Sequence, residues 1–201
     1  MPCMYDLKPA FQHLLRPLAR GLARAGATAN QVTVVAMVVS ASTGLALFLQ
    51  HKTPAVWLLL PLMLFLRMAL NAIDGLLARE YKMASRLGSI LNELGDVMSD
   101  AALYLPLAVI PGLSSGLVVT IVLLAVMSEM TGVVAIQIGA HRRQDGPMGK
   151  SDRAVVFGAI GLALGLGVPV DPWLQAVLGL TVVLLVMTVV NRARRALEVT
   201  T

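Results

Sequence analysis

The sequence NAIDGLLAREYKMASRLGSILNELGDVMSD, residues 71–100, places several acidic and amide side chains between two long apolar runs. Asn71 and Asp74 are three residues apart, so they share one helix face. Asn92, Asp96 and Asp100 follow at intervals of four and stack along another face. A short loop joins the two runs, so we expect antiparallel neighbouring helices whose polar faces form one acidic pocket.

The composition is that of a membrane protein. Of the 201 residues, 57% are hydrophobic and 13% are charged, whereas soluble domains carry about a quarter charged residues. The net charge of +5 would suit nucleic acid, but the basic residues cluster in short loops between apolar runs. That pattern is typical of contact with anionic lipid headgroups and of membrane orientation. We therefore expect a lipid membrane, and no nucleic acid, as partner.

Six apolar segments approach the length of about 20 residues that a membrane-spanning helix needs. Residues 5–24 repeat leucine at helical spacing with arginine and lysine between, which predicts an amphipathic helix on the membrane surface. The alternative for that segment is a solvated basic tail. The chain is thus predicted to be one all-α integral membrane domain, residues 1–201. The expected spans are 31–50, 54–74, 87–110, 115–139, 154–169 and 172–191.

The basic residues also predict the orientation of the chain. Nearly all of them fall at the termini and in the loops after the second, fourth and sixth spans. Because positively charged loops stay in the cytoplasm, both termini are predicted to be cytoplasmic. In a bacterium this membrane would be the inner, or plasma, membrane.

The acidic pocket predicts a bound cation. Burying several carboxylates together is costly unless cations neutralise them. A set of oxygen ligands without cysteine or histidine favours a hard ion, Mg²⁺ or Mn²⁺. Gly75 and Gly88 flank the pocket, where a missing side chain lets backbone approach a ligand. The alternative is an ionisable pair that only packs a helix bundle, although acids within a membrane are usually functional.

The same residues resemble a known signature. The run Asn71-x2-Asp74-Gly75-x2-Ala78-Arg79-x8-Gly88-x3-Asn92-x3-Asp96 is similar to D-x2-D-G-x2-A-R-x8-G-x3-D-x3-D, the pattern of the CDP-alcohol phosphatidyltransferase family. Every spacing fits. The segment TANQVT, residues 28–33, resembles the Asn-x-x-Thr at the entry to that family's first span, so the likeness covers most of the chain.

The resemblance implies an enzyme of phospholipid biosynthesis and a homodimer. It would transfer a phosphatidyl group from a CDP-linked lipid, typically CDP-diacylglycerol, to an alcohol acceptor with release of CMP. By the same resemblance Asp74 would be a metal ligand, and Asp96 the base for the acceptor hydroxyl or a shared ligand. The residues that would line the CDP site are Gly75, Ala78, Arg79 and Gly88.

The chain departs from the family pattern at the first and third aspartates, which are Asn71 and Asn92. An amide oxygen ligates Mg²⁺ without adding charge, so two metals would be under-neutralised unless Glu93 and Asp100 compensate. We therefore expect a two-metal site, a one-metal site or an inactive protein, and favour retained activity because the glycines and spacings are intact. The alternative is a catalytically inactive, CDP-lipid-binding membrane partner protein. The predicted metal ligands are Asn71, Asp74, Asn92, Asp96 and Asp100.

The loop HRRQDGPMGKSDR, residues 141–153, is basic and predicts an anion site. The resemblance implies that Lys150 and Arg153 bind a phosphate on the acceptor. The alternative is an ordinary cytoplasmic basic loop, which would leave an unphosphorylated acceptor. Arg67 and Glu129 lie within spans, where a buried partner is expected for each. A cation or proton transporter is a third, weaker hypothesis, since its acids would line a path across the membrane.

Overall fold

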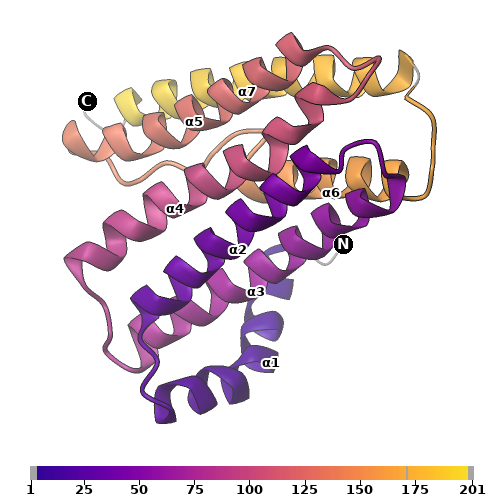
Figure 1. Ribbon diagram of the computed structural model, residues 1–201. Coiled ribbons are helices and arrows are strands. Elements are labelled where there is room, and N and C mark those ends of the chain that lie inside the picture. Colours follow the sequence, from indigo (N-terminus) through magenta and orange to yellow (C-terminus); the bar gives the residue numbers. More distant parts are fainter. Residues whose placement is uncertain (1–3, 171, 199–201) are drawn as a thin grey trace. The chain divides into compact units, whose positions relative to one another are not determined.

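The computed structural model describes residues 4–170 and 172–198, and within them every regular element is a helix (Figure 1). This confirms the predicted all-α class. The elements are α1 (Met4–Arg24), α2 (Ala29–Leu49), η1 (Pro54–Leu58), α3 (Leu59–Glu80), α4 (Arg86–Tyr104), η2 (Leu105–Val109), α5 (Ser115–Gln137), α6 (Lys150–Gly165) and α7 (Pro172–Glu198).

Two of the expected spans combine an α-helix with a short 3₁₀ helix. The segment 54–74 begins as η1 and continues as α3, and the segment 87–110 is α4 followed by η2. Pro54 and Pro106 lie at the starts of the two 3₁₀ helices. Because proline lacks a backbone N–H and its ring clashes with the preceding turn, α4 cannot continue unchanged through Pro106.

Local sequence signals set several helix ends. The Ser85 hydroxyl accepts a hydrogen bond from the Gly88 N–H at 2.9 Å, and so caps the start of α4. The Ser114 hydroxyl accepts from the Leu117 N–H at 3.3 Å and caps α5 in the same way. After α1 the chain turns at Gly26, whose φ of +80° is favourable only for glycine.

The chain divides into two compact units, and the first comprises 4–42 and 63–99 of the described residues. In this unit α1 packs its apolar side on α3 and on the start of α2 (Figure 1). Phe11 on α1 meets Phe65 on α3 edge to face, with ring centroids 6.2 Å apart. The buried residues of this core are Ala19, Ala29, Val32, Ile73, Leu76 and Leu77.

The polar side of α1 bears an ion pair, Arg16 to Glu80 of α3, at 3.0 Å. Leu14 and Leu18 on α1 are exposed. The helix is therefore present where the leucine spacing predicts it, with part of its apolar surface covered by α3. Its predicted place on a membrane surface stays a prediction.

The second unit comprises 43–62, 100–170 and 172–198. Figure 1 shows α5 and α7 side by side, and α6 packs against η1. Small residues allow that close approach, because a Cβ added to Gly165 of α6 would lie 2.5 Å from a methyl carbon of Leu58. Tyr104 stacks on Phe157 of α6 with a centroid separation of 3.9 Å.

Four stretches of the described residues are long and apolar enough to cross a membrane: Ala29–Leu49, Pro54–Glu80, Ser115–Gln137 and Pro172–Glu198. The helix α6 has 16 residues, a length of about 24 Å, against a hydrocarbon core of about 30 Å. The helix α4 bears Glu93, Asp96 and Asp100. The other two expected spans thus form helices but fall short in length or apolarity, and the number of six spans stays a prediction.

Candidate active site

The Asp96 carboxylate is held by two side chains of α3. The Asn71 amide donates to its Oδ1 at 3.0 Å, and the Arg67 guanidinium lies 3.4 Å from the same oxygen. The Arg67 guanidinium also donates to the backbone carbonyl of Asp96 at 3.3 Å. Arg67 and Asn71 are four residues apart, so they project from one face of α3 toward α4. Two donors on one oxygen fix the orientation of this carboxylate.

The Asp74 carboxylate is bonded to a neutral hydroxyl. Thr33 Oγ1 on α2 donates to Asp74 Oδ2 at 2.9 Å and lies 3.1 Å from the carbonyl of Ala29. Asp74 is only 7% exposed, so the hydroxyl partly offsets the loss of water around a buried charge. The threonine of the segment TANQVT therefore has a structural partner in the motif itself.

The asparagine of that segment meets the start of α4. Asn30 donates through its amide to the Ser85 hydroxyl at 3.2 Å. A Cβ on Gly88 would lie 2.6 Å from Asn30 Oδ1, a separation that real Cβ atoms essentially never show. Gly88 is thus required for the approach of α4 to α2 within this unit, whatever further part it has in ligand binding.

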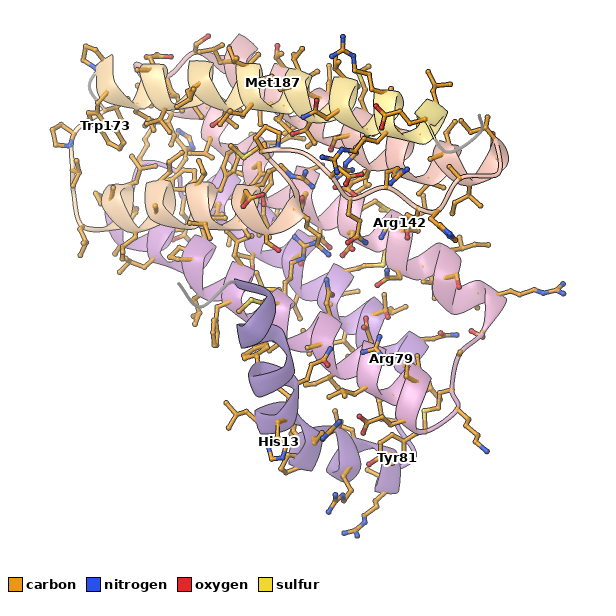
Figure 2. The ribbon with its side chains drawn as sticks, turned by 180° about the vertical axis from the view of Figure 1, so that it is seen from behind. His13, Arg79, Tyr81, Arg142, Trp173 and Met187 are labelled. Carbon is orange, nitrogen blue, oxygen red and sulfur yellow. The ribbon has the colours of Figure 1, made fainter. Side chains whose placement is uncertain are left out.

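The remaining motif residues lie on α3 toward its C-terminal end, where Figure 2 labels Arg79. A Cβ on Gly75 would lie 3.1 Å from both terminal nitrogens of Arg79, so the guanidinium folds back over the glycine. Ala78 packs at the edge of the first unit's core. All of the predicted CDP-lining residues thus belong to the first unit, and their contact with a nucleotide stays a prediction.

We call Asn71, Asp74, Asn92 and Asp96, with Arg67 and Thr33, the carboxylate cluster. The metal-ligating atoms that its aspartates and asparagines offer are carboxylate and amide oxygens, which suit Mg²⁺ or Mn²⁺. Among the described residues no group of three or more His, Cys, Asp or Glu side chains forms a ready metal cage. Mg²⁺ is commonly held by one or two carboxylates together with substrate phosphates. The cluster therefore suits a divalent cation, and whether it holds one or two stays a prediction.

The second unit holds a cluster of opposite character around Glu129 of α5. Arg153 of α6 lies 3.1 Å from Glu129 Oε1 and 3.0 Å from Asp100 Oδ2. The other carboxylate oxygen, Glu129 Oε2, is 3.5 Å from Arg192 and 3.6 Å from Arg142. We call Arg142, Arg153, Arg192, Glu129 and Asp100 the arginine cluster. Three guanidinium groups thus face two carboxylates.

Backbone and hydroxyl oxygens complete this arginine cluster. The Ser128 hydroxyl accepts from Arg153 at 3.4 Å, and the Ser128 carbonyl accepts from Arg192. Arg192 also donates to the carbonyl of Asp145 in the loop that follows α5, where Figure 2 labels Arg142. The side chains of Arg153 and Arg192 are 1% and 2% exposed. Their charges are therefore neutralised inside the protein.

Some predicted site residues meet in the structure. Asn71 and Asp96, both predicted ligands, are hydrogen-bonded. Asp100, predicted as a ligand, pairs with Arg153, predicted to bind an acceptor phosphate. Asn92 is half-buried on α4 one turn before Asp96, and Lys150 is half-buried at the start of α6. Asp100 as a metal ligand stays a prediction that its pairing with Arg153 does not support.

Sequence reasoning marked two further residues without finding their partners. Arg67 and Glu129 are charged residues inside apolar runs, which is the signal that identified them. Arg67 contacts the predicted base, and Glu129 gathers the arginine cluster. Arg192 carried no such signal, because it follows the last apolar run like any terminal basic residue.

With this geometry in view, the class is defined by comparison with known proteins. Residues 27–196 match the sequence profile described as CDP-alcohol phosphatidyltransferase. The chain therefore belongs to the CDP-alcohol phosphatidyltransferase family, an enzyme class of phospholipid synthesis, as the resemblance implies.

The chain is also similar to individual members of known function or location. A protein of Escherichia coli (strain K12), described as inner membrane protein YnbA, is 44% identical over 194 residues, which cover 96% of each chain. Phosphatidylinositol phosphate synthase of Mycobacterium marinum is 34% identical over 98 residues, 48% of this chain and 40% of that one. Family membership and the apolar helices make the chain an integral membrane protein.

Solved structures agree with the fold. The phosphatidylinositol phosphate synthase of Mycobacterium tuberculosis with CDP-DAG bound has a TM-score of 0.72 at 25% identity, over 90% of this chain and 92% of that one. The same enzyme in complex with manganese and citrate has a TM-score of 0.71 at 25% identity, over 90% and 87%.

Proposed function

We propose that the chain transfers a phosphatidyl group from CDP-diacylglycerol to the hydroxyl of an alcohol acceptor and releases CMP. The observation that carries this proposal is the contact of Asn71 with Asp96, at 3.0 Å between α3 and α4. This contact supports the interpretation that the motif residues come together although asparagine replaces two of the family's aspartates. The family to which the chain belongs supplies the reaction type.

The roles of the carboxylate cluster follow from its donors. A divalent cation, Mg²⁺ or Mn²⁺, would be held by Asp74, Asp96 and the amide oxygens of Asn71 and Asn92, and would neutralise the diphosphate of the donor. Manganese in the related mycobacterial enzyme supports this choice of ion. Asp96 takes the proton of the acceptor hydroxyl as general base, and its hydrogen bond from Asn71 holds the carboxylate in place.

The donor lipid is proposed to bind beside Gly75, Ala78, Arg79 and Gly88. The guanidinium of Arg79 is exposed and lies over Gly75, where it is available to an anionic group. The CDP-DAG in the related mycobacterial structure supports this ligand class. Replacing Arg79 with methionine is expected to raise the KM for the CDP-lipid more than it lowers kcat.

The acceptor is proposed to bind near Lys150 and Arg153, as the basic loop predicts. The arginine cluster has one more guanidinium than carboxylates, which supports attraction of an anionic group. Arg153 is already bonded to Asp100 and Glu129, so a phosphate would have to share or displace one of these carboxylates. An acceptor panel must therefore contain both phosphorylated and unphosphorylated alcohols.

The topology proposed for the chain is that of a single six-span domain with both termini in the cytoplasm. Besides the four long apolar stretches, α4 and α6 are proposed as the two further spans. The helix α1 is proposed to lie on the cytoplasmic surface with its exposed leucines toward lipid. The inner membrane named for the bacterial relative supports a plasma-membrane location. A homodimer is the proposed assembly.

The test is CMP release from CDP-diacylglycerol by purified protein in detergent, with Mg²⁺ or Mn²⁺ and a panel of alcohols. The panel contains glycerol 3-phosphate, an inositol phosphate, inositol and serine. We expect one acceptor to stimulate release and EDTA to stop it. No CMP release with any alcohol of the panel, while CDP-lipid still binds, would instead identify a CDP-lipid-binding protein without transferase activity.

A further inference from the structure

Glu129 is a carboxylate within an apolar helix. The sequence of α5, SGLVVTIVLLAVMSEMTGVVAIQ, contains no other charged residue, and Glu129 is 8% exposed. A buried carboxylate is strongly disfavoured unless it is paired and hydrogen-bonded. The groups that face Glu129 are therefore those that this part of the second unit provides for a negative charge.

Two guanidinium groups from different helices hold the two carboxylate oxygens of Glu129. Arg153 of α6 lies 3.1 Å from Oε1, and Arg192 of α7 lies 3.5 Å from Oε2. The two arginine side chains are 1% and 2% exposed. Guanidinium groups bind carboxylate and phosphate oxygens in the same way. The two arginines thus form a site for an oxyanion, and Glu129 lies in it.

The same two arginines also donate to other oxygens of the protein. Arg153 donates to Asp100 Oδ2 at 3.0 Å, and Arg192 donates to the carbonyl of Asp145 at 3.1 Å. A phosphate bound to both guanidinium groups would lie against Glu129, and like charges in a buried site repel each other strongly. A phosphate would therefore bind there only if Glu129 left its place.

The oxyanion site extends toward the surface of the second unit. Arg142, in the basic loop that follows α5, lies 3.6 Å from Glu129 Oε2, and its side chain is 30% exposed. Glu129 thus lies between an arginine of that loop and the two buried guanidinium groups. An anionic substrate that approached from the loop would meet a place that a carboxylate of the protein already fills.

We propose that Glu129 takes the place of a substrate phosphate between Arg153 and Arg192, so that the acceptor alcohol carries no phosphate group. The acceptor class rests on the proposed transferase function. The filling of the oxyanion site by Glu129 rests only on contacts within the second unit. Of the alcohols in the acceptor panel, inositol is then the expected kind of acceptor, and glycerol 3-phosphate and inositol phosphate are not.

The first measurement is the effect of inorganic phosphate on the thermal unfolding midpoint of the full chain, in detergent and without divalent cations. Glu129→Ala removes the carboxylate and leaves room for an oxyanion beside the two buried guanidinium groups. Phosphate at about 100 times its Kd for this variant should raise the midpoint of Glu129→Ala by about 5 °C more than that of the wild type, because it binds the folded state.

Two variants serve as controls. Glu129→Gln is also uncharged but fills the space, so phosphate should stabilise it much less than Glu129→Ala. Glu80→Ala removes a carboxylate from an exposed arginine pair, and its midpoint should respond to phosphate as the wild type does. Equal shifts in the wild type and in Glu129→Ala would overturn the inference. If Glu129→Ala does not fold, the acceptor preference of the wild type decides the result.

The second measurement compares matched alcohols in the CMP-release assay: glycerol with glycerol 3-phosphate, and inositol with inositol phosphate. In the wild type we expect kcat/KM to be at least about tenfold higher for the unphosphorylated alcohol, because the charge of Glu129 opposes a phosphate. In Glu129→Ala this preference should fall by about tenfold or more. A wild type that prefers the phosphorylated alcohol would contradict the proposed acceptor class.

The two measurements separate this inference from the proposed function. A chain that releases CMP only with phosphorylated alcohols refutes the inference and leaves the transferase function standing. A chain that releases no CMP with any alcohol, while phosphate stabilises Glu129→Ala more than the wild type, refutes the function and with it the acceptor class. That second result would still support Glu129 as the internal anion of the site.

Discussion

The carboxylate cluster and the arginine cluster contain the same kinds of group in opposite proportion. In the first, two carboxylates receive a hydroxyl, an amide and one guanidinium. In the second, three guanidinium groups surround Glu129 and Asp100, and every bond is internal. Each cluster lies in a different compact unit.

This contrast separates the residues expected to act in function from those expected to act in stability. The carboxylate cluster has two carboxylates against the guanidinium of Arg67, which leaves negative charge to attract a cation. A carboxylate surrounded by guanidinium groups has its charge cancelled, and losing it leaves buried cations without a partner. We therefore expect changes in the carboxylate cluster to act mainly on catalysis, and changes at Glu129 to act mainly on folding.

The sharpest test of this division is Asp96→Asn, which has the largest expected effect. Removing the base should lower CMP release by at least about a hundredfold, because the amide cannot take the acceptor's proton. Membrane insertion should stay close to that of the wild type. The thermal unfolding midpoint in detergent should fall less than in Glu129→Gln, because Asp96 contacts the buried Arg67 whereas Glu129 contacts both Arg153 and Arg192. A variant with wild-type rate would exclude Asp96 as the base and would contradict the catalytic role of the carboxylate cluster.

The counterpart in the other cluster is Glu129→Gln. The amide keeps the shape of the side chain but leaves Arg153 and Arg192 buried beside a neutral group, which should cost about 3–5 kcal/mol of unfolding free energy. Denaturant titration in mixed micelles measures this loss. An unchanged midpoint would show that the arginine cluster is not a structural element, and would favour an external anion as its partner.

A smaller effect is expected at Thr33, whose hydroxyl donates to Asp74 at 2.9 Å. Thr33→Ala should weaken Mn²⁺ binding by a factor of about ten or more, since a hydrogen bond to a charged group is worth about 1.5–3 kcal/mol. Isothermal titration with Mn²⁺ gives the affinity. Thr33→Ser keeps the hydroxyl and is the matched control; equal affinities in all three proteins would remove Thr33 from the cluster.

The smallest effect is expected for the exposed ion pair of Arg16 and Glu80. Their side chains are 50% and 39% exposed, so water already screens both charges. Arg16→Met should change the unfolding free energy by no more than about 1 kcal/mol. This value is the baseline for Glu129→Gln, and a loss as large as that at Glu129 would mean that burial does not distinguish the two ion pairs.

Much of the fold could be predicted from the sequence, because helix positions depend on local signals. The apolar runs mark α2, α3, α5 and α7, and leucine spacing marks α1. The ends of α4 were set by a serine cap and by Pro106, both visible in the sequence. The predicted span 87–110 corresponds to α4 followed by the 3₁₀ helix η2, which was not predicted, and its crossing of the membrane stays a prediction.

The candidate site was predicted less completely. Motif spacing identified Asn71 and Asp96 as members of one site, and they are hydrogen-bonded. Spacing could not show that Asp100 pairs with Arg153, which lies 53 residues further along the chain. Motif spacing also could not predict the hydrogen bond between Thr33 and Asp74, because a side-chain contact between two helices depends on their rotation and separation.

The helical class, the membrane environment, the family motif and the identity of the oxygen donors could be predicted from the sequence alone. These follow from composition and from spacing within single helices, where a residue's face is fixed by the helical period. Which charges cancel one another depends on the tertiary structure. The distances between helices set these contacts. A change of a few ångströms would decide whether Arg67 contacts Asp96, and whether Glu129 is neutralised by its arginines or can bind another group.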